Sequence, residues 1–143
     1  MTYNKIEMNI MRAINFRGQT LNSVKDDKGN VVTEWKSWVY GDLLHRPNGV
    51  LHILTLDEEK GVYENHIITP DTFGQFTGVT DKNGKEIYEG DIVRWIDSDG
   101  HERIDSVKRI NGGLCLCNSQ YSVGSYYGLE VVGNIHDNPE LIN

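Results

Sequence analysis

Two cysteines, Cys115 and Cys117, are the residues of this 143-residue sequence with the most readily named chemistry. Separated by one residue, they place both sulfurs on the same face of a strand, where two thiolates are the start of a soft-metal site. The other ligands would be distant histidines, for example His101 and His136, because no Cys-x-x-Cys or His-x-x-x-His spacing is present. Leucines alternate with the cysteines, so we interpret both as small side chains of a buried strand and predict no metal and no cofactor.

Acidic turns offer a second possible chemistry. Segments 97–100 and 81–84 combine Asp, Ser or Asn, and Gly as calcium loops do. In both, the glycine is the fourth residue instead of the sixth, and the glutamate that closes the twelve-residue calcium frame is absent. Positive φ angles at Asn or Gly are what tight hairpins need, so we predict hairpin turns at both segments and at Asp27–Asn30.

Catalytic constellations are the third possibility. The five histidines, at positions 45, 52, 66, 101 and 136, are potential bases, yet the chain has no Gly-x-Ser-x-Gly elbow, no His-Glu-x-x-His and no phosphate-binding loop. Adjacent acids at 26–27 and 58–59 imitate a glycosidase pair, but such pairs are more typical of solvated loops. We therefore predict that the protein is not an enzyme and assign no catalytic residue.

Aromatic side chains are the candidate binding residues. Trp38 and Tyr40 lie two apart and share one face of a predicted strand. Tyr126 and Tyr127 lie in a Gly- and Ser-rich loop, Ser122 to Gly128, and exposed aromatics in such loops serve as interface anchors. The alternative, that these rings pack in the core, stays open for both pairs.

The charge balance limits the partners. The chain has 14 Lys and Arg against 21 Asp and Glu, a formal charge of −7, which disfavours attraction to nucleic acid or anionic membranes. A nucleic-acid-binding small barrel remains the alternative, and its candidate side chains are Arg94, Trp95, Arg103, Lys108 and Arg109. No window approaches the roughly 18 apolar residues of a membrane span. The N-terminal segment resembles no signal peptide, so we expect a cytoplasmic protein.

Short runs rich in Val, Ile, Tyr and Trp alternate with glycine-containing turns, a pattern typical of antiparallel β structure. The predicted strands are 11–16, 34–40, 50–56, 67–69, 76–80, 92–96, 103–110, 114–117 and 129–132. Gly90 and Asp91 are predicted to form the turn that enters the strand at 92–96, with a positive φ at the glycine. Pro70 interrupts pairing and marks the best candidate boundary between two parts of the chain.

The segment from Phe76 to Val93, FTGVTDKNGKEIYEGDIV, resembles the signature of the YopX family of phage and prophage proteins. Segments 16–18 with 38–41, 69–75 and 130–141 resemble the opening, the lead-in and the C-terminal tail of that family. The insert between Gly18 and Trp38 departs from the family pattern because it carries an extra tryptophan, Trp35.

This resemblance implies a mostly β fold in two parts. Residues 1–75 are expected to form an irregular N-terminal β-sheet assembly, with residues 1–10 as a flexible extension. Residues 76–143 are expected to form a small Src-homology-3-like β-barrel with a C-terminal tail. The resemblance also implies a phage or prophage gene expressed in a bacterial host, but no established activity. Our preferred hypothesis is a non-enzymatic protein-interaction module that binds a host or phage protein and forms a possible homo-oligomer.

Overall fold

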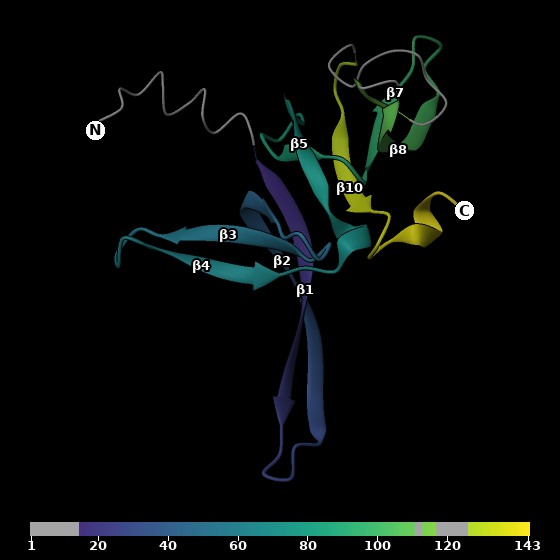
Figure 1. The fold of residues 1–143 in the computed structure, drawn as a ribbon. Helices are drawn as coiled ribbons and strands as arrows, with labels where there is room; N and C mark the ends of the chain where they lie inside the picture. The colour runs from purple at the N-terminus through teal and green to yellow at the C-terminus, as the bar shows by residue number, and fades with distance from the viewer. Residues whose placement is uncertain (1–14, 111–112, 117–125) are drawn as a thin grey trace. The chain divides into compact units, whose positions relative to one another are not determined.

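The computed structural model describes residues 15–110, 113–116 and 126–143 (Figure 1). These residues are mostly β, and the predicted extension at 1–10 lies outside them. The strands are β1 (Phe16–Lys25), β2 (Val31–His45), β3 (Leu51–Asp57), β4 (Val62–Ile67), β5 (Gly74–Thr80), β6 (Glu86–Tyr88), β7 (Asp91–Ile96), β8 (Glu102–Ile110), β9 (Gly113–Leu116) and β10 (Glu130–Asn134). Two 3-10 turns, η1 (Pro70–Thr72) and η3 (Pro139–Leu141), are the helical elements of this described part, and neither has the length or apolarity to cross a membrane.

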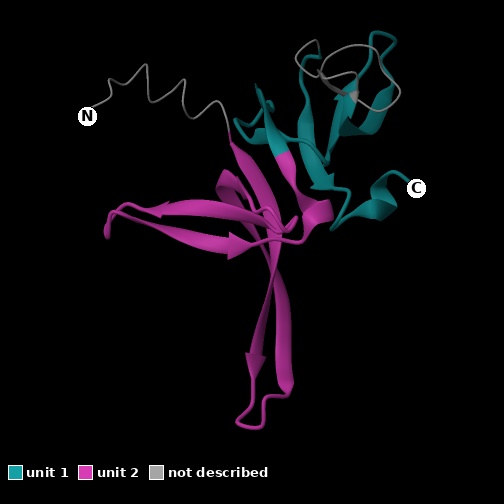
Figure 2. Cartoon of the chain, in the orientation of Figure 1, with its two compact units in different colours: residues 1–14, 75–143 teal, residues 15–74 magenta. Residues whose placement is uncertain are grey.

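The chain divides into two compact units (Figure 2). One unit comprises residues 15–74 and contains β1 to β4. The described residues of the other unit lie within 75–143 and contain β5 to β10. Each unit has its own buried side chains, so each is described separately below.

Unit 15–74 is built around β2, which is longer than the strands it pairs with. The strand order is β4-β3-β2-β1, and every neighbour is antiparallel. From Val31 to Gly41, β2 pairs with β1, whereas only Asp42 to His45 pair with β3. Two hairpins therefore share this strand, and the distal half of the β1–β2 hairpin extends as a two-stranded ribbon (Figure 1).

Two glycines allow close packing where the hairpins meet. A Cβ at Gly41 would lie 2.0 Å from the carbonyl oxygen of Leu54, and a Cβ at Gly18 would lie 2.3 Å from the Ile68 side chain. Ile68 and Ile53 are both buried there. Only a residue without a side chain fits at Gly41, because the obstacle is backbone and cannot turn aside.

Unit 75–143 has its core under an antiparallel sheet of order β10-β7-β8-β9. Ile87, Val93, Val107 and Leu129 form the buried cluster, and Trp95 packs against it. A second strand pair, β5–β6, contributes Ile87 and brings the Phe76 and Tyr88 rings into a tilted contact, with ring centres 5.6 Å apart.

The mostly β fold is confirmed, but the Src-homology-3-like barrel is not. In the described residues of 75–143, β9 and β10 are opposite ends of an open four-stranded sheet. A sheet closes into a barrel only when its end strands pair with each other, and these two do not. Alternating apolar residues predict individual strands, but they do not predict the long-range pairing that closes a sheet into a barrel.

The turn predictions are confirmed at their glycines. Gly29, Gly84 and Gly100 have φ angles of 84°, 81° and 83°, as tight hairpin turns require. Gly90 has a φ of 90°, and the next residue, the buried Asp91, accepts a hydrogen bond from the backbone N–H of Tyr88 (2.8 Å). The polar residues after each strand thus determine where the chain reverses.

The carboxylate of Asp81 connects the β5–β6 turn to β10. It accepts backbone hydrogen bonds from Asn83 (2.8 Å), Lys85 (2.9 Å) and Val131 (3.0 Å). Burial raises the pKa of this carboxyl, whereas the hydrogen bonds from Val131, Lys85 and Asn83 lower it, and the balance leaves the pKa below its ordinary value. The ionised form therefore holds two segments of the unit together.

We expect Gly41→Ala to destabilise unit 15–74 by about 3 kcal/mol, the upper end of ordinary overpacking costs, because the new methyl collides with the Leu54 carbonyl. Urea unfolding measures the loss. Lys36→Ala, on the exposed part of the same strand, is the matched control and should change stability by less than about 0.5 kcal/mol. Equal stability of the two variants would show that β3 does not approach Gly41 this closely.

Asp81→Asn should lower stability at neutral pH by about 1.5–3 kcal/mol, the range for hydrogen bonds to a charged group. A carboxyl whose pKa is lower in the folded state stabilises the fold above its unfolded pKa, and this stabilisation is lost as pH falls through the folded pKa. The difference between wild type and variant should thus shrink below about pH 4. Asp99→Asn, in an exposed turn, is the control. A pH-independent difference would contradict this role for the Asp81 charge.

Candidate functional site

The distal β1–β2 hairpin exposes a set of large apolar side chains. We call them the apolar ribbon, and its members are Leu21, Val24, Val31, Val32 and Trp35. Val32 is 65% exposed and Leu21 is 60% exposed. Isolated surface hydrophobics are common, but five on one two-stranded element are an unusual concentration of exposed apolar side chains.

The register places these apolar side chains on both faces of the ribbon. Trp35 lies opposite Asn22 on one face, and Leu21 lies opposite Lys36 on the other, because neighbouring residues of a strand point to opposite sides. The register shifts between Val24 and Lys25. Neither face of the distal ribbon is buried within unit 15–74.

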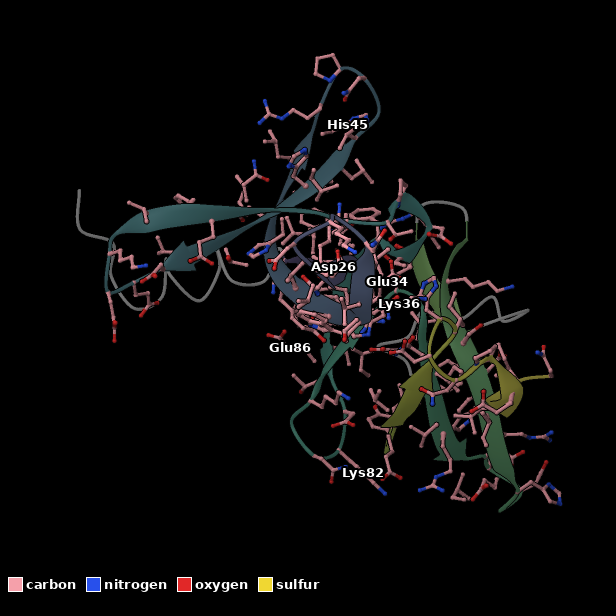
Figure 3. All side chains as sticks on the ribbon, turned by 90° about the horizontal axis from the view of Figure 1, so that it is seen from below. Asp26, Glu34, Lys36, His45, Lys82 and Glu86 are labelled. Atoms are coloured by element: carbon pink, nitrogen blue, oxygen red, sulfur yellow. The ribbon has the colours of Figure 1, made fainter. Side chains whose placement is uncertain are left out.

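The turn at the tip of the ribbon is well defined. Asp26 accepts hydrogen bonds from the backbone N–H groups of Lys28 (2.9 Å) and Asn30 (2.9 Å). The bond from Asn30 is the main reason that the pKa of the Asp26 carboxyl lies below its ordinary value. Figure 3 labels Asp26 with Glu34 and Lys36, which carry charge along the ribbon. The apolar side chains thus lie among charges of both signs.

The predicted binding residues Trp38 and Tyr40 lie on β2, where the ribbon meets the rest of unit 15–74. Both are on one face, with Gln19 opposite Trp38 and Arg17 opposite Tyr40. The guanidinium of the buried Arg17 lies 4.5 Å from the centre of the Trp38 ring, a cation–π contact. Trp38 is consequently half-buried, whereas Tyr40 is 45% exposed. The alternative that these rings pack in the core therefore describes Trp38 better than Tyr40.

The other predicted pair, Tyr126 and Tyr127, belongs to unit 75–143, and the two residues differ in environment. Tyr126 packs edge-on against Trp95 with ring centres 5.3 Å apart and adds to the core. Tyr127 is 92% exposed. Residues 122–125 of the predicted loop lie outside the described residues, as does Cys117 of the cysteine pair.

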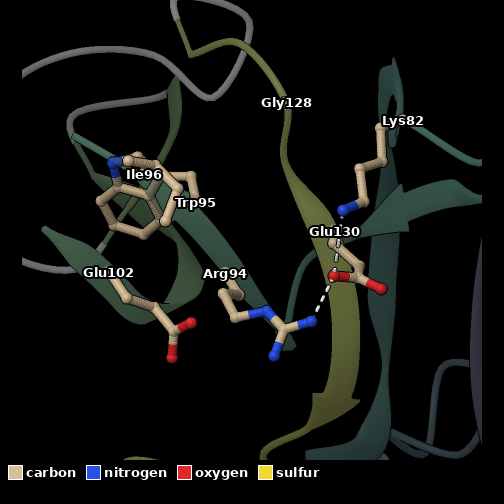
Figure 4. A pocket seen from close by; sticks show the side chains of 7 residues that line it. All are labelled: Lys82, Arg94, Trp95, Ile96, Glu102, Gly128 and Glu130. Carbon is tan, nitrogen blue, oxygen red and sulfur yellow. Dashed lines mark hydrogen bonds and ion pairs between the residues drawn. The ribbon is translucent and has the colours of Figure 1, made fainter. Parts of the chain in front are cut away.

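A pocket of about 310 Å³ in unit 75–143 is charged rather than apolar (Figure 4). Its lining consists of Lys82, Arg94, Trp95, Ile96, Glu102, Gly128 and Glu130. The carboxylate of Glu130 accepts a hydrogen bond from Arg94 (2.5 Å) and lies 3.3 Å from the Lys82 amine. The bond from Arg94, followed by that from Lys82, lowers the pKa of Glu130 below its ordinary value. These charges satisfy one another, so the pocket offers little to an ionic ligand.

The remaining basic residues of the nucleic-acid alternative are also engaged. Arg103 donates to Asp97 (2.7 Å), and Arg109 donates to Gln75 (2.7 Å). Arg109 also lies 3.8 Å from Glu89. Acidic or amide groups therefore accompany Arg103 and Arg109 of β8. These partners reduce the positive charge that the sheet offers to a phosphate backbone.

Asp97, Asp99 and His101 bring their possible ligand atoms within 4.8 Å of one another at the β7–β8 turn. Hydrogen bonds of the turn account for this cluster. Asp97 accepts backbone hydrogen bonds from Asp99 (2.9 Å) and His101 (2.9 Å), as well as the Arg103 side chain. We therefore assign the cluster to the predicted hairpin turn and propose no metal site there.

The apolar ribbon was missed by sequence reasoning, although one signal was present. A turn was predicted at Asp27–Asn30, with Leu21 and Val24 before it and Val31 and Val32 after it. Together these features indicate a hairpin. The predicted strand before the turn nevertheless ended at Phe16, and the predicted strand after it began only at Glu34. Trp35, the extra tryptophan of the insert between Gly18 and Trp38, is one of these exposed side chains.

Comparisons with known proteins supply a family and a structural likeness. The family model described as YopX protein matches residues 32–143. No curated protein matches the sequence. Among solved structures, the chain is similar to protein EF1440 from Enterococcus faecalis, with 22% identity over 91% of this chain and 98% of that chain and a TM-score of 0.44.

Proposed function

This chain belongs to the YopX protein family, and we propose that it is a phage or prophage accessory protein that works in the bacterial cytoplasm as a non-enzymatic protein-interaction module. The observation that carries this proposal is the apolar ribbon. Its five large apolar side chains are exposed on a two-stranded element of unit 15–74.

The energetics favour a covered ribbon. A two-stranded hairpin alone is marginally stable in water, and it gains most from a third strand or a packed face. Each fully covered Val or Leu side chain contributes about 1.5–3 kcal/mol. Val32, Leu21 and Trp35 are all about half exposed or more, so a partner that covers them gains much of this free energy.

The chemistry of the ribbon indicates the kind of partner. Apolar residues on both faces fit a protein groove that encloses the ribbon, with Trp35 as the largest anchor. Charges of both signs, from Lys25, Glu34 and Lys36, would lie at the rim, where they add specificity more than affinity. Tyr40, on the same strand, extends the contact surface, and Tyr127 is a separate, second candidate contact.

A double variant of the ribbon tests the proposal. In an affinity capture from host lysate, proteins retained by wild type are identified, purified and titrated against each variant by calorimetry. Trp35→Ser with Val32→Ser should weaken binding at least about 30-fold, the effect of losing one interface hot spot. The melting temperature should be unchanged because both side chains are exposed.

Thr33→Ser, an exposed polar change between the two sites, is the matched control and should bind as wild type does. Tyr127→Ser measures the contribution of the exposed tyrosine. If a purified partner binds the double variant with wild-type affinity, the apolar ribbon is not its docking surface.

A nucleic-acid-binding module is the second candidate, supported by the aromatic Trp95 beside Arg94 on β7. The pairing of Arg94 with Glu130 and of Arg103 with Asp97 argues against it. We expect dissociation constants for duplex and single-stranded DNA no tighter than about 10 μM at physiological salt, the weak range of non-specific binding. Fluorescence anisotropy measures them. A salt-sensitive constant below about 1 μM would favour this second candidate over protein interaction.

A further inference from the structure

Strand β4 is an edge with few of the features that normally prevent pairing with another strand. It ends the strand order of unit 15–74, next to β3. Edge strands are normally blunted by Lys, Pro, a bulge or a cover. Val62–Ile67 contains neither Lys nor Pro, and its register with β3 is regular along all six residues. Tyr63 and Ile67 are 60% and 64% exposed.

The hydrogen bonds of the β3–β4 ladder show which backbone groups point outward. The N–H of Ile68 donates to the carbonyl of Leu51 (3.1 Å), so these two form a hydrogen-bonded pair. Such pairs alternate along an antiparallel ladder, and β4 therefore directs the backbone groups of Val62, Glu64 and His66 toward β3. The N–H and C=O groups of the intervening residues, Tyr63, Asn65 and Ile67, point away from β3.

We propose that two copies of this chain pair through β4, antiparallel about a two-fold axis at Asn65. In this register, Tyr63 lies opposite Ile67 of the second copy, and Asn65 lies opposite its counterpart. The outward-pointing N–H and C=O groups of Tyr63, Asn65 and Ile67 then pair with those of the second copy. Each facing pair of residues forms two hydrogen bonds. Exposed apolar Tyr63 and Ile67 cover each other twice, once on each side of the axis.

The Glu64 and His66 side chains, which lie 3.8 Å apart within one copy, favour this register. With the axis at Asn65, each Glu64 carboxylate lies opposite the His66 imidazole of the second copy, in the pairs whose side chains approach most closely. Both side chains are accessible, since 54% of the Glu64 side chain and 29% of the His66 side chain are exposed. An axis one residue earlier would place the two Glu64 carboxylates opposite each other, which is unfavourable.

The proposal concerns a surface separate from the apolar ribbon and goes beyond the proposed function. Within unit 15–74, β3 lies between β4 and the strand that carries Trp35. A ribbon variant should therefore leave the self-association intact, and a β4 variant should leave capture of a partner by the ribbon intact. Failure of either proposal is thus distinguishable from failure of the other.

Disulfide cross-linking tests the register. The full chain, with Cys115→Ser and Cys117→Ser, carries Asn65→Cys or the control Glu64→Cys. Facing residues at Asn65 have Cα atoms about 5.5 Å apart, within disulfide range. Two Glu64→Cys residues would be diagonal neighbours about 7–8 Å apart. We expect at least about tenfold more covalent dimer for Asn65→Cys on a non-reducing gel. Preferential linking of Glu64→Cys would overturn the register.

Sedimentation of the wild-type chain tests the association without a new cysteine. The apparent mass should rise towards a dimer between about 10 μM and about 1 mM, since a single edge pairing buries little area. Ile67→Lys should remain monomeric throughout, with an unchanged melting temperature at low concentration. If wild type remains monomeric and Asn65→Cys does not link, self-pairing is wrong, and this edge is left for a strand of another protein.

Discussion

The mismatch in strand length around β2 is the constraint on which unit 15–74 depends. Of the fifteen residues of β2, ten between Val31 and Gly41 pair with the ten residues of β1, and only Asp42 to His45 pair with β3. The two hairpins can share the strand because Gly41 has no side chain to hold Leu54 away. As a result, β1, β2 and β3 lie side by side only near Gly41. Farther from Gly41, the β1–β2 hairpin of unit 15–74 extends as two strands alone (Figure 1).

The two units differ in which of their exposed groups already have partners within the chain. In unit 75–143, Glu130 pairs with both Arg94 and Lys82, and Asp97 pairs with Arg103, so opposite charges largely satisfy each other. In unit 15–74 the apolar ribbon and the edge of β4 expose groups that gain free energy when covered. Surfaces of this kind suit the protein partners proposed above, whereas nucleic acids require unpaired cations.

Sequence reasoning was most successful where structure is local. The turns at Gly29, Gly84, Gly90 and Gly100 followed from residue types that tolerate positive φ. The strand at 92–96 was predicted within one residue of β7. By contrast, β4 was largely missed because Glu64 and Asn65 interrupt its apolar alternation. No strand was predicted over most of β1, and the predicted strand at 11–16 lies mostly outside the described residues. Pairing with β3 holds β4 in place, and a partner strand is not visible in a local pattern.

The sequence alone determined that the chain is β-rich, where its tight turns lie and which family its signature segment resembles, because turn chemistry and alternation act over a few residues. Only the tertiary structure decided which of the exposed-looking aromatics are covered. Trp38 is half-buried beneath Arg17, Tyr126 packs on Trp95, and Trp35 remains exposed. These outcomes depend on contacts between residues distant along the chain, and the same side chain is core or interface according to which strands reach it.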